Sequence, residues 1–422
     1  MNKSKVFLIV FITWCLILTL FPIPVTGNAS YGNVLLISDA NPENCRMPKL
    51  VEHDNITVML WMEGDAIKCY LNQSGTENIT MIFEHNEMQA YDAVIFQETL
   101  IVICSYYNDS SFFIMNRVLN LSSFTWNQES VLFTDVYNTK LFEGVLALLI
   151  DNVTSTLHVA FTYYRYLSIK ECSCLARWLG PSTLGTVHIV SEGLYERNGL
   201  HPDRIMYNNT YYYIISTLKF PHTIANLMSW TETTGNMLLG SDPAESYAYS
   251  FIHNNESLYL FKIDASVLEV HVLRNGIFSL IHKTDDLTIS PSYLDVAINA
   301  SYVLIGYSKA FMGLREVYLS IFSINGTFIT TRCVSLPLRP YRQGITVVQQ
   351  ELSVSARDAG FVVWVDQTNV FGDFCYDVFG SLGTVESSLE PVSQIISSFN
   401  AWWIIPALIA ALILYFYLKR KQ

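Results

Sequence analysis

Seven strongly apolar segments recur along the middle of the chain, separated by polar residues that favour turns. Their first residues lie 44 to 58 positions apart. Runs of this length, rich in Val, Ile, Tyr and Phe and without a helical period, are typical of β-strands. The segments are ITVMLWME from Ile56, LIVICSYY from Leu100, TLHVAFTY from Thr156, YYYIISTL from Tyr211, SLYLFKID from Ser257, YVLIGYSK from Tyr302 and GFVVWVDQ from Gly360.

A shorter strand and a turn precede each apolar segment, so that each pair forms a predicted hairpin. The pattern is clearest in YLDVAINASYVLIGY from Tyr293, and a second hairpin follows in VYLSIFSINGTFITT from Val317. The repeating unit is therefore four strands in about 50 residues. Four-stranded units repeated without helices favour a β-propeller, because a ring of blades leaves only short strand edges.

The repeat therefore predicts an all-β ectodomain in residues 28–383, a β-propeller of about seven four-stranded blades. One further strand, VLLISD from Val34 to Asp39, is available to complete the last blade and close the ring. Two β-sandwiches in tandem or an irregular β-solenoid are the alternative arrangements.

Apolar segments at both ends predict a membrane-anchored protein. Residues 1–27 begin with MNKSK and continue with an apolar stretch, which is typical of a secretory signal peptide. Residues 401–418 carry no charge and, as a transmembrane helix, would nearly span a bilayer, with the basic cytoplasmic tail 419–422 after them. Residues 384–400 are the predicted stalk, which gives a single-pass type I protein at the plasma membrane with its ectodomain outside. Retention of the first segment as an anchor, or processing of the last one, stays open.

Charge and motifs limit the partners. The chain has 25 Lys and Arg against 37 Asp and Glu, a net charge of −12, which argues against nucleic acid and anionic lipid surfaces. No spacing of His and Cys matches a metal site, and no phosphate-binding loop is present. We predict no metal and no cofactor, and an extracellular glycan or protein as the ligand.

Sequons indicate a glycosylated exterior. Eleven Asn-x-Ser/Thr sequons follow the signal segment, whereas chance would give roughly three or four. Five of them occupy the turn before the apolar segment in five repeats, which places the predicted glycans on one face of the ring; Asn also favours turns by itself. These five are Asn55, Asn152, Asn208, Asn255 and Asn299, and the other predicted glycosylation sites are Asn72, Asn78, Asn108, Asn120 and Asn325. The eleventh sequon begins at Asn28.

Seven cysteines follow the signal segment, and outside the cell they are predicted to form disulfides with one left over. The sequence does not determine the pairing. We expect Cys45–Cys69 and Cys333–Cys375.

At this level the repeat resembles the sialidase-like propellers, whose blades carry Asp-box turns between the outer two strands. GFVVWVDQ, with Trp364 and Asp366, is similar to the family's strand ending, as is MLWMEGD around Trp61. NLSSFTW from Asn120 to Trp126 sits where an Asp box would be, but without its Asp and Gly. Partial matches also occur in SINGTF from Ser323 and SARDAGFVVW from Ser355. No repeat holds an intact motif, so the resemblance concerns fold more than activity.

The resemblance implies three arginines that clamp a sugar carboxylate and a Tyr paired with Glu, because guanidinium groups match carboxylates in geometry. The family's Phe-Arg-Ile-Pro segment is absent, since FPIP from Phe21 has no Arg and lies in the signal segment. No arginine of this chain is assigned to the clamp, and no catalytic residue is predicted.

We expect the ligand site on the face opposite the in-phase sequons, in the loops that join hairpins and blades. Aromatic and Arg side chains in these loops suit sugar stacking or protein contacts. The candidate ligand-binding residues are Tyr164, Arg165, Tyr166, Arg197, Arg339, Tyr341 and Arg342. The prediction is a non-enzymatic surface or envelope propeller that binds a glycan or protein; a tethered sialidase-like glycoside hydrolase and a structural coat protein are the alternatives.

Overall fold

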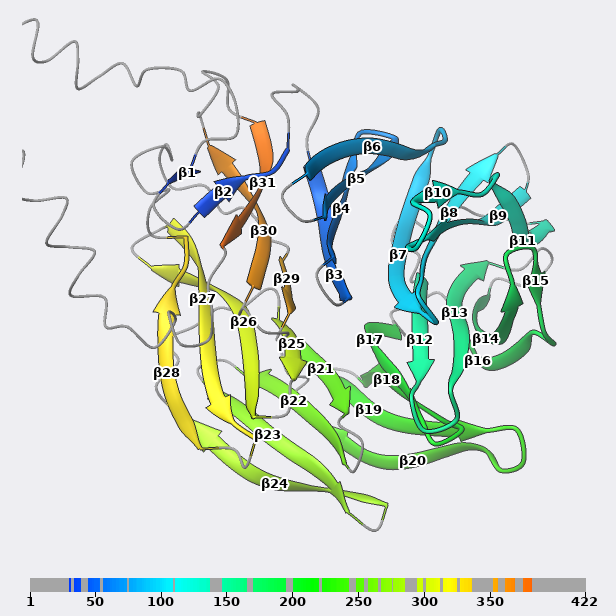
Figure 1. The fold of residues 1–422 in the computed structure, drawn as a ribbon. Helices are drawn as coiled ribbons and strands as arrows, with labels where there is room; N and C mark the ends of the chain where they lie inside the picture. Colours follow the sequence, from blue (N-terminus) through cyan, green and yellow to red (C-terminus); the bar gives the residue numbers. More distant parts are fainter. Residues whose placement is uncertain are drawn as a thin grey trace, which may run out of the picture.

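The computed structural model describes residues 30–381, except 32–33, 39–44, 54–55, 74–75, 109–110, 137–145, 165–169, 195–199, 220–221, 243–247, 254–256, 265–266, 275, 285–293, 299–300, 312–313, 325–326, 336–351, 356–360 and 369–374. Every regular element in these residues is a β-strand. The strands form seven separate antiparallel sheets, which lie around a common centre (Figure 1). The predicted seven-bladed propeller is confirmed.

Each of the first six blades follows the chain outward from the centre of the ring. Blade 1 contains β3 (Cys45–His53), β4 (Ile56–Glu63), β5 (Ala66–Gln73) and β6 (Thr76–Glu84). Blade 2 contains β7 (Met88–Phe96), β8 (Thr99–Asn108), β9 (Ser111–Asn120), β10 (Thr125–Trp126) and β11 (Ser130–Val136). Blade 3 contains β12 (Leu146–Asp151), β13 (Thr156–Tyr164), β14 (Lys170–Gly180), β15 (Thr183–Leu184) and β16 (His188–Leu194). Blade 4 contains β17 (Leu200–Tyr207), β18 (Thr210–Lys219), β19 (His222–Thr231) and β20 (Gly235–Asp242). Blade 5 contains β21 (Ala248–His253), β22 (Leu258–Asp264), β23 (Val267–Arg274) and β24 (Ile277–Thr284). Blade 6 contains β25 (Leu294–Ile298), β26 (Tyr302–Phe311), β27 (Leu314–Ser323) and β28 (Phe328–Cys333).

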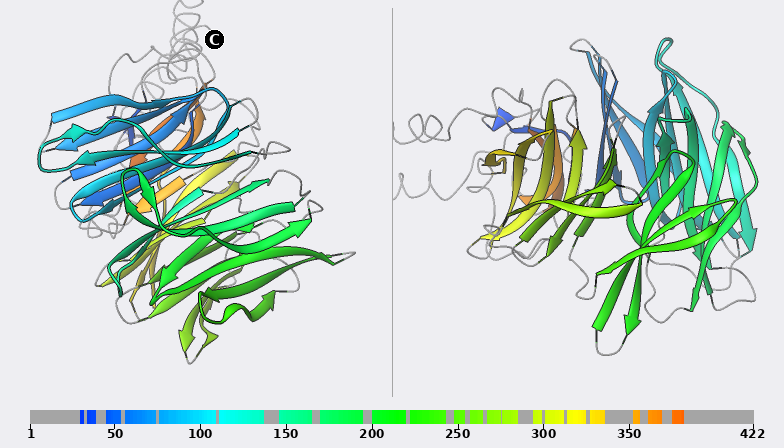
Figure 2. Two further views of the ribbon diagram at one scale, coloured as in Figure 1. Left: turned by 90° about the vertical axis from the view of Figure 1, so that its right-hand side faces the viewer. Right: turned by 90° about the horizontal axis from the view of Figure 1, so that it is seen from below.

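Blade 7 combines the two ends of the described chain. Its inner strands are β29 (Leu352–Ser355), β30 (Phe361–Thr368) and β31 (Cys375–Ser381), and its outer strands are β2 (Val34–Leu36) and β1 (Ser30–Tyr31). Strand β2 pairs with β31 (Figure 2), and the Val378 amide donates to Ser38 Oγ at 3.1 Å. The N-terminal strand therefore completes the last blade, as the sequence predicted.

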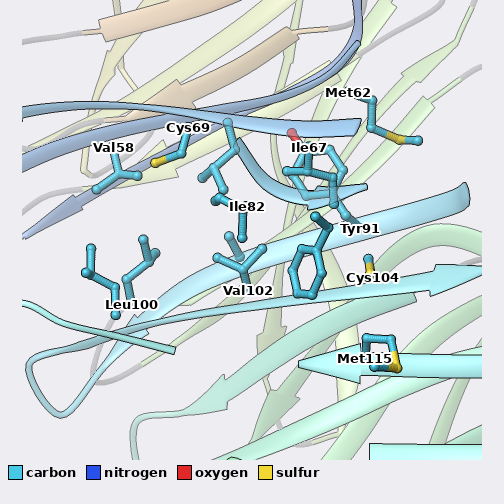
Figure 3. Packing of buried hydrophobic residues seen from close by; sticks show 14 of the residues in the cluster. Val58, Met62, Ile67, Cys69, Ile82, Tyr91, Leu100, Val102, Cys104 and Met115 are labelled. Carbon is cyan, nitrogen blue, oxygen red and sulfur yellow. The ribbon is translucent and has the colours of Figure 1, made fainter. Parts of the chain in front are cut away.

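The first strands of neighbouring blades contact one another around the whole ring, from β3 through β7, β12, β17, β21, β25 and β29 back to β3. The seven apolar segments of the sequence are the second strands of the blades. Their apolar runs are continuous because both faces of a second strand are buried between neighbouring blades. In β4, Val58 (Figure 3) and its neighbour Leu60 pack toward blade 2, whereas Met59 and Trp61 pack toward blade 7.

Blades 2 and 3 depart from the four-strand unit, because short strands β10 and β15 precede their outer strands β11 and β16. The segment Asn120–Trp126 forms the turn between β9 and β10, which is the position predicted from the resemblance. Asn120 Oδ1 accepts hydrogen bonds from the amides of Ser122 and Ser123 at 2.9 and 3.0 Å. The side-chain amide thus stabilises the turn without the Asp of an Asp box.

The expected Cys45–Cys69 disulfide is wrong. Cys45 lies on β3 opposite Glu63 of β4, and Cys69 lies on β5 opposite Leu60 of the same strand. Two strands separated by a third are about 9–10 Å apart, beyond the reach of a disulfide. The two thiols also face different interblade cores. No disulfide joins any two of the six cysteines with described side chains.

The Cys333–Cys375 pair stays a prediction, because the side chain of Cys375 is outside the described residues. The predicted signal peptide, stalk, transmembrane helix and tail are also outside them. Among the residues that are described, no helix has the length and apolarity needed to cross a membrane.

Candidate functional site

The antiparallel order of the strands gives the ring two faces. Turns between the first and second strands, and between the third and outer strands, lie on one face, here called the turn face. Connections between the second and third strands, and between blades, lie on the opposite loop face. The candidate site residues Arg165, Tyr166, Arg197, Arg339, Tyr341 and Arg342 are outside the described residues. Tyr164 ends β13, and its side chain is not described either, so this site stays a prediction.

Four of the predicted glycosylation sites have described side chains, and all four are exposed. Asn120, Asn152 and Asn208 lie on the turn face, and Asn108 lies on the loop face at the end of β8. The turn face thus holds most of these exposed sequons. Whether they carry glycans stays a prediction.

A buried carboxylate joins the turn faces of blades 3 and 4. Asp151 Oδ2 accepts a hydrogen bond from the Asn209 amide at 2.7 Å, and Oδ1 accepts one from the Asn208 amide at 3.1 Å. Oδ1 also accepts from Val153 and Thr154 within its own turn, at 3.1 and 3.4 Å. Burial acts to raise the pKa of Asp151, but these donors outweigh it and hold the pKa below its ordinary value.

The centre of the ring contains a second charged cluster. Lys49 Nζ of blade 1 lies 3.1 Å from Asp92 Oδ1 of blade 2, and Asp92 Oδ2 accepts the Leu148 amide of blade 3 at 2.7 Å. Asp295 Oδ2 of blade 6 accepts from the Val354 amide and from Ser353 Oγ of blade 7, at 2.8 and 3.2 Å. These contacts connect the first strands of blades 1, 2 and 3 and those of blades 6 and 7, and the Leu50 amide of blade 1 joins the two groups by donating to Ser353 Oγ at 3.3 Å.

Electrostatics couples the members of this cluster. The attraction of Asp92 raises the pKa of Lys49; burial opposes that rise and Asp295 adds to it. Burial raises the pKa of Asp295, and Lys49 and the amide donors offset part of that effect. The polar atoms of the cluster are directed at neighbouring blades, so the described part of the centre is organised for ring closure.

The structure contains a Tyr–Glu pair, but it lies away from the centre. Tyr318 Oη donates to Glu316 Oε2 at 3.0 Å, and both residues belong to β27, the third strand of blade 6. Arg204 lies on a first strand, β17, is only 7% exposed, and its three guanidinium nitrogens have no hydrogen-bond partner at normal distance among the described residues. It lies close to Tyr211, where it lowers a tyrosine pKa that burial raises. The sequence pattern did not single out either group.

A cleft lies between blades 4 and 5. It has a volume of about 180 Å³. The edge strands β20 and β24 form its two sides, and apolar side chains of both blades form its floor. Its lining includes Ile214, Leu227, Leu239, Tyr249, Leu260 and Phe278, with Lys262 and His271 as its ionisable groups.

The ionisable groups of the cleft surround one carboxylate. Glu269 Oε2 lies 3.1 Å from both Lys262 Nζ and His271 Nε2, and Glu269 Oε1 lies 3.5 Å from Lys283 Nζ. Burial acts to raise the pKa of Glu269, but the hydrogen bonds from Lys262 and His271 lower it overall. No linear motif in the sequence indicates this group, because only the pairing of the strands brings its members together.

No known protein family matches the sequence, and no curated protein matches it. The chain is similar in structure to the β-propeller domain of the trilobed protease from Pyrococcus furiosus, with 8% identity and a TM-score of 0.48 over 81% of this chain and 94% of that one. It is also similar to the phage phi92 endosialidase, with 8% identity and a TM-score of 0.47 over 83% of this chain and 69% of that one. A third similar structure is the subtype N10 neuraminidase-like protein of A/little yellow-shouldered bat/Guatemala/060/2010, with 10% identity and a TM-score of 0.40 over 84% of this chain and all of the other. The similarity to sialidase-like and other propellers is one of fold.

Proposed function

We propose that the chain is a single-pass surface or envelope glycoprotein whose propeller binds an extracellular glycan or protein without catalysis. The arrangement at the centre of the ring is the main support. Lys49, Asp92 and Asp295 are engaged there with one another and with backbone amides of neighbouring blades. A hydrolase would need charged groups directed at a substrate, whereas these groups stabilise the ring.

The Tyr–Glu pair on β27 adds to this argument. A covalent or acid–base role requires the pair to reach the reacting atoms. Tyr318 and Glu316 lie two strands out from the first strand of their blade. Their hydrogen bond is therefore a packing feature of blade 6 in this proposal.

Two assays on the same purified chain test the proposal. One measures hydrolysis of a fluorogenic sialoside, and the other measures binding on a glycan array and to candidate surface proteins. Selective binding without turnover is the expected result. Turnover that is retained by Tyr318→Phe and lost in an arginine variant of the loop face would contradict the non-enzymatic assignment. Lateral self-association with no ligand in either assay would favour the coat-protein alternative.

A further inference from the structure

Two sequons of the turn face lie in the innermost turns of neighbouring blades. Asn152 lies in the turn between β12 and β13 of blade 3, and Asn208 lies in the turn between β17 and β18 of blade 4. Strands β12 and β17 are first strands, and they contact each other near the centre of the ring. Both Asn side chains are exposed, and every residue of the two turns is described. The two sequons therefore open to solvent on the same face.

One carboxylate limits the distance between the two sequons. Asp151 Oδ1 accepts a hydrogen bond from the amide of Val153, the residue after Asn152, and another from the amide of Asn208, both at 3.1 Å. The two amide nitrogens bonded to this oxygen are thus at most about 6 Å apart. Standard backbone bond lengths then keep the Cα atoms of Asn152 and Asn208 within about 10 Å of each other. N-linked oligosaccharides are bulky surface groups, so two of them at this spacing would contact each other.

The other described sequons are farther from Asn152. The inner turn of blade 2, on the other side of blade 3 from Asn208, contains Gln97 and Glu98 and no sequon. Asn120 lies in an outer turn of blade 2, two strands farther from the centre of the ring. Asn108 lies on the loop face, at the opposite end of the ten-residue strand β8, which is about 30 Å long.

We infer that Asn152 and Asn208 each carry an N-linked oligosaccharide and that the two sugars shield each other from trimming, so that both stay rich in mannose. The inference rests on the proposed glycoprotein and specifies which of its sugars are neighbours. The pair would cover the turn-face seam between blades 3 and 4, where Asp151 joins the two turns.

Both chemical steps have defined reactants. At each Asn, the side-chain Nδ2 forms a bond to the anomeric carbon of an oligosaccharide donor linked to a lipid diphosphate. The bond from that carbon to the phosphate oxygen breaks, the lipid diphosphate leaves, and the amide loses a proton to a base. Trimming is hydrolysis, in which water replaces the glycosidic bond of a terminal mannose. The glycosidase that catalyses it has to approach one sugar past its neighbour, which is the physical reason for the shielding.

The test uses the full chain made in cultured mammalian cells, with mass spectrometry of glycopeptides reporting the sugar at each site. We expect mainly oligomannose at Asn152 and Asn208 in the wild type. Thr210→Val removes the second sequon but keeps Asn208 and its backbone contact with Asp151. The oligomannose fraction at Asn152 should then fall at least twofold. Asn152→Gln is the reciprocal variant and should lower the oligomannose fraction at Asn208.

A matched control removes a sequon that is not a neighbour. Asn108→Gln deletes an exposed sequon Asn on the opposite face and should leave the sugars at Asn152 unchanged. Thermal unfolding of each variant verifies that it is folded, so that a change in trimming reports the missing sugar and not a loosened blade.

The inference is overturned if Asn152 or Asn208 carries no sugar in the wild type, or if the wild-type sugars at these two sites are fully trimmed. It is also overturned if Thr210→Val leaves Asn152 unchanged, or if Asn108→Gln has an equal effect. The remaining sequons separate this result from the proposed function. Sugars elsewhere on the chain, with independent trimming at Asn152 and Asn208, contradict only this inference. A chain without sugar at any sequon contradicts the proposed glycoprotein as well.

Discussion

Replacing Asp151 tests whether side chains on the turn face hold neighbouring blades together. Asp151→Ala removes four hydrogen bonds, of which those from Asn208 and Asn209 cross from blade 3 to blade 4. A hydrogen bond to a charged group contributes about 1.5–3 kcal/mol where water is excluded. The donors are in an exposed turn and can bind water after the substitution, so we expect a loss of about 2–4 kcal/mol in total. At ~1.4 °C per kcal/mol for a domain of roughly 350 residues, the melting temperature should fall by about 3–6 °C.

The pH dependence has a definite sign. The pKa of Asp151 is lowered in the folded protein, so its stabilisation is fully present above the unfolded value of about 3.9 and is lost as pH falls toward the folded value. Asp151→Asn keeps the shape and one acceptor oxygen without the charge. The difference in melting temperature between wild type and Asp151→Asn should therefore be largest near neutral pH and shrink below about pH 4.

Differential scanning calorimetry at pH 7 and pH 3.5 provides the measurement. Asp65→Asn is the matched control, because Asp65 also lies in a turn but its side chain is exposed; its effect should be within about 0.5 kcal/mol. Neither Asp151 variant changes the sequon at Asn152, so glycosylation stays comparable. An Asp151→Asn protein that melts with the wild type at pH 7, or a difference that is the same at both pH values, would refute the reasoning.

Four further predictions concern other parts of the ring. Gly306→Ala should destabilise the protein by about 1–3 kcal/mol in urea unfolding, because a Cβ there would lie 2.3 Å from a side-chain carbon of β29. Gly180→Ala is the control and should not destabilise the protein, because a Cβ at Gly180 meets no atom within 4 Å. Equal effects of the two substitutions would contradict this account. Burial raises the pKa of Cys69 to about 12, so the thiol stays protonated at pH 8 and iodoacetamide should modify it only after unfolding. Mass spectrometry would detect the modification, and rapid labelling of Cys69 in the folded protein would contradict this prediction. Leu36→Pro should lower the melting temperature strongly because proline disrupts the pairing of β2 with β31, and an unchanged value would show that this strand does not close the ring. Arg204→Met should raise the melting temperature, because it removes a buried guanidinium that has no hydrogen-bond partner in the described part of the chain. A lowered value would instead indicate a partner for that charge.

The sequence predicted those parts of the fold that are buried on both sides. Second strands such as β4 and β30 read as continuous apolar runs, because Trp61 and Trp364 and their neighbours are covered by the blades on either side. Outer strands are half exposed and have weaker patterns. The additional short strands β10 and β15 were missed for this reason, since two-residue elements leave no periodicity to detect.

The contacts that organise the candidate sites could not be predicted in the same way. Ser353 Oγ accepts the amide of Leu50, and these residues are 303 positions apart. Likewise, Lys262, Glu269 and Lys283 become neighbours only through the registers of β22, β23 and β24. Nothing in the local sequence encodes such proximity. The incorrect Cys45–Cys69 pairing has the same origin, because it required knowledge of which strand lies between them.

The closure of blade 7 determines when this protein is able to fold. Ser38 bonds with Val378, 340 positions later in the chain, and at ~5–20 residues per second a ribosome needs roughly 20–70 s to make the intervening segment. During that interval β2 has no β31 to pair with. The blade at each open end of the incomplete ring has a neighbouring blade on one side only. Blades 1 to 6 are therefore expected to collapse in order as they emerge, while the ring closes only after β31 has been made. The half-made ring therefore exposes apolar interblade surfaces for tens of seconds, a state that is prone to aggregation until the last blade is added.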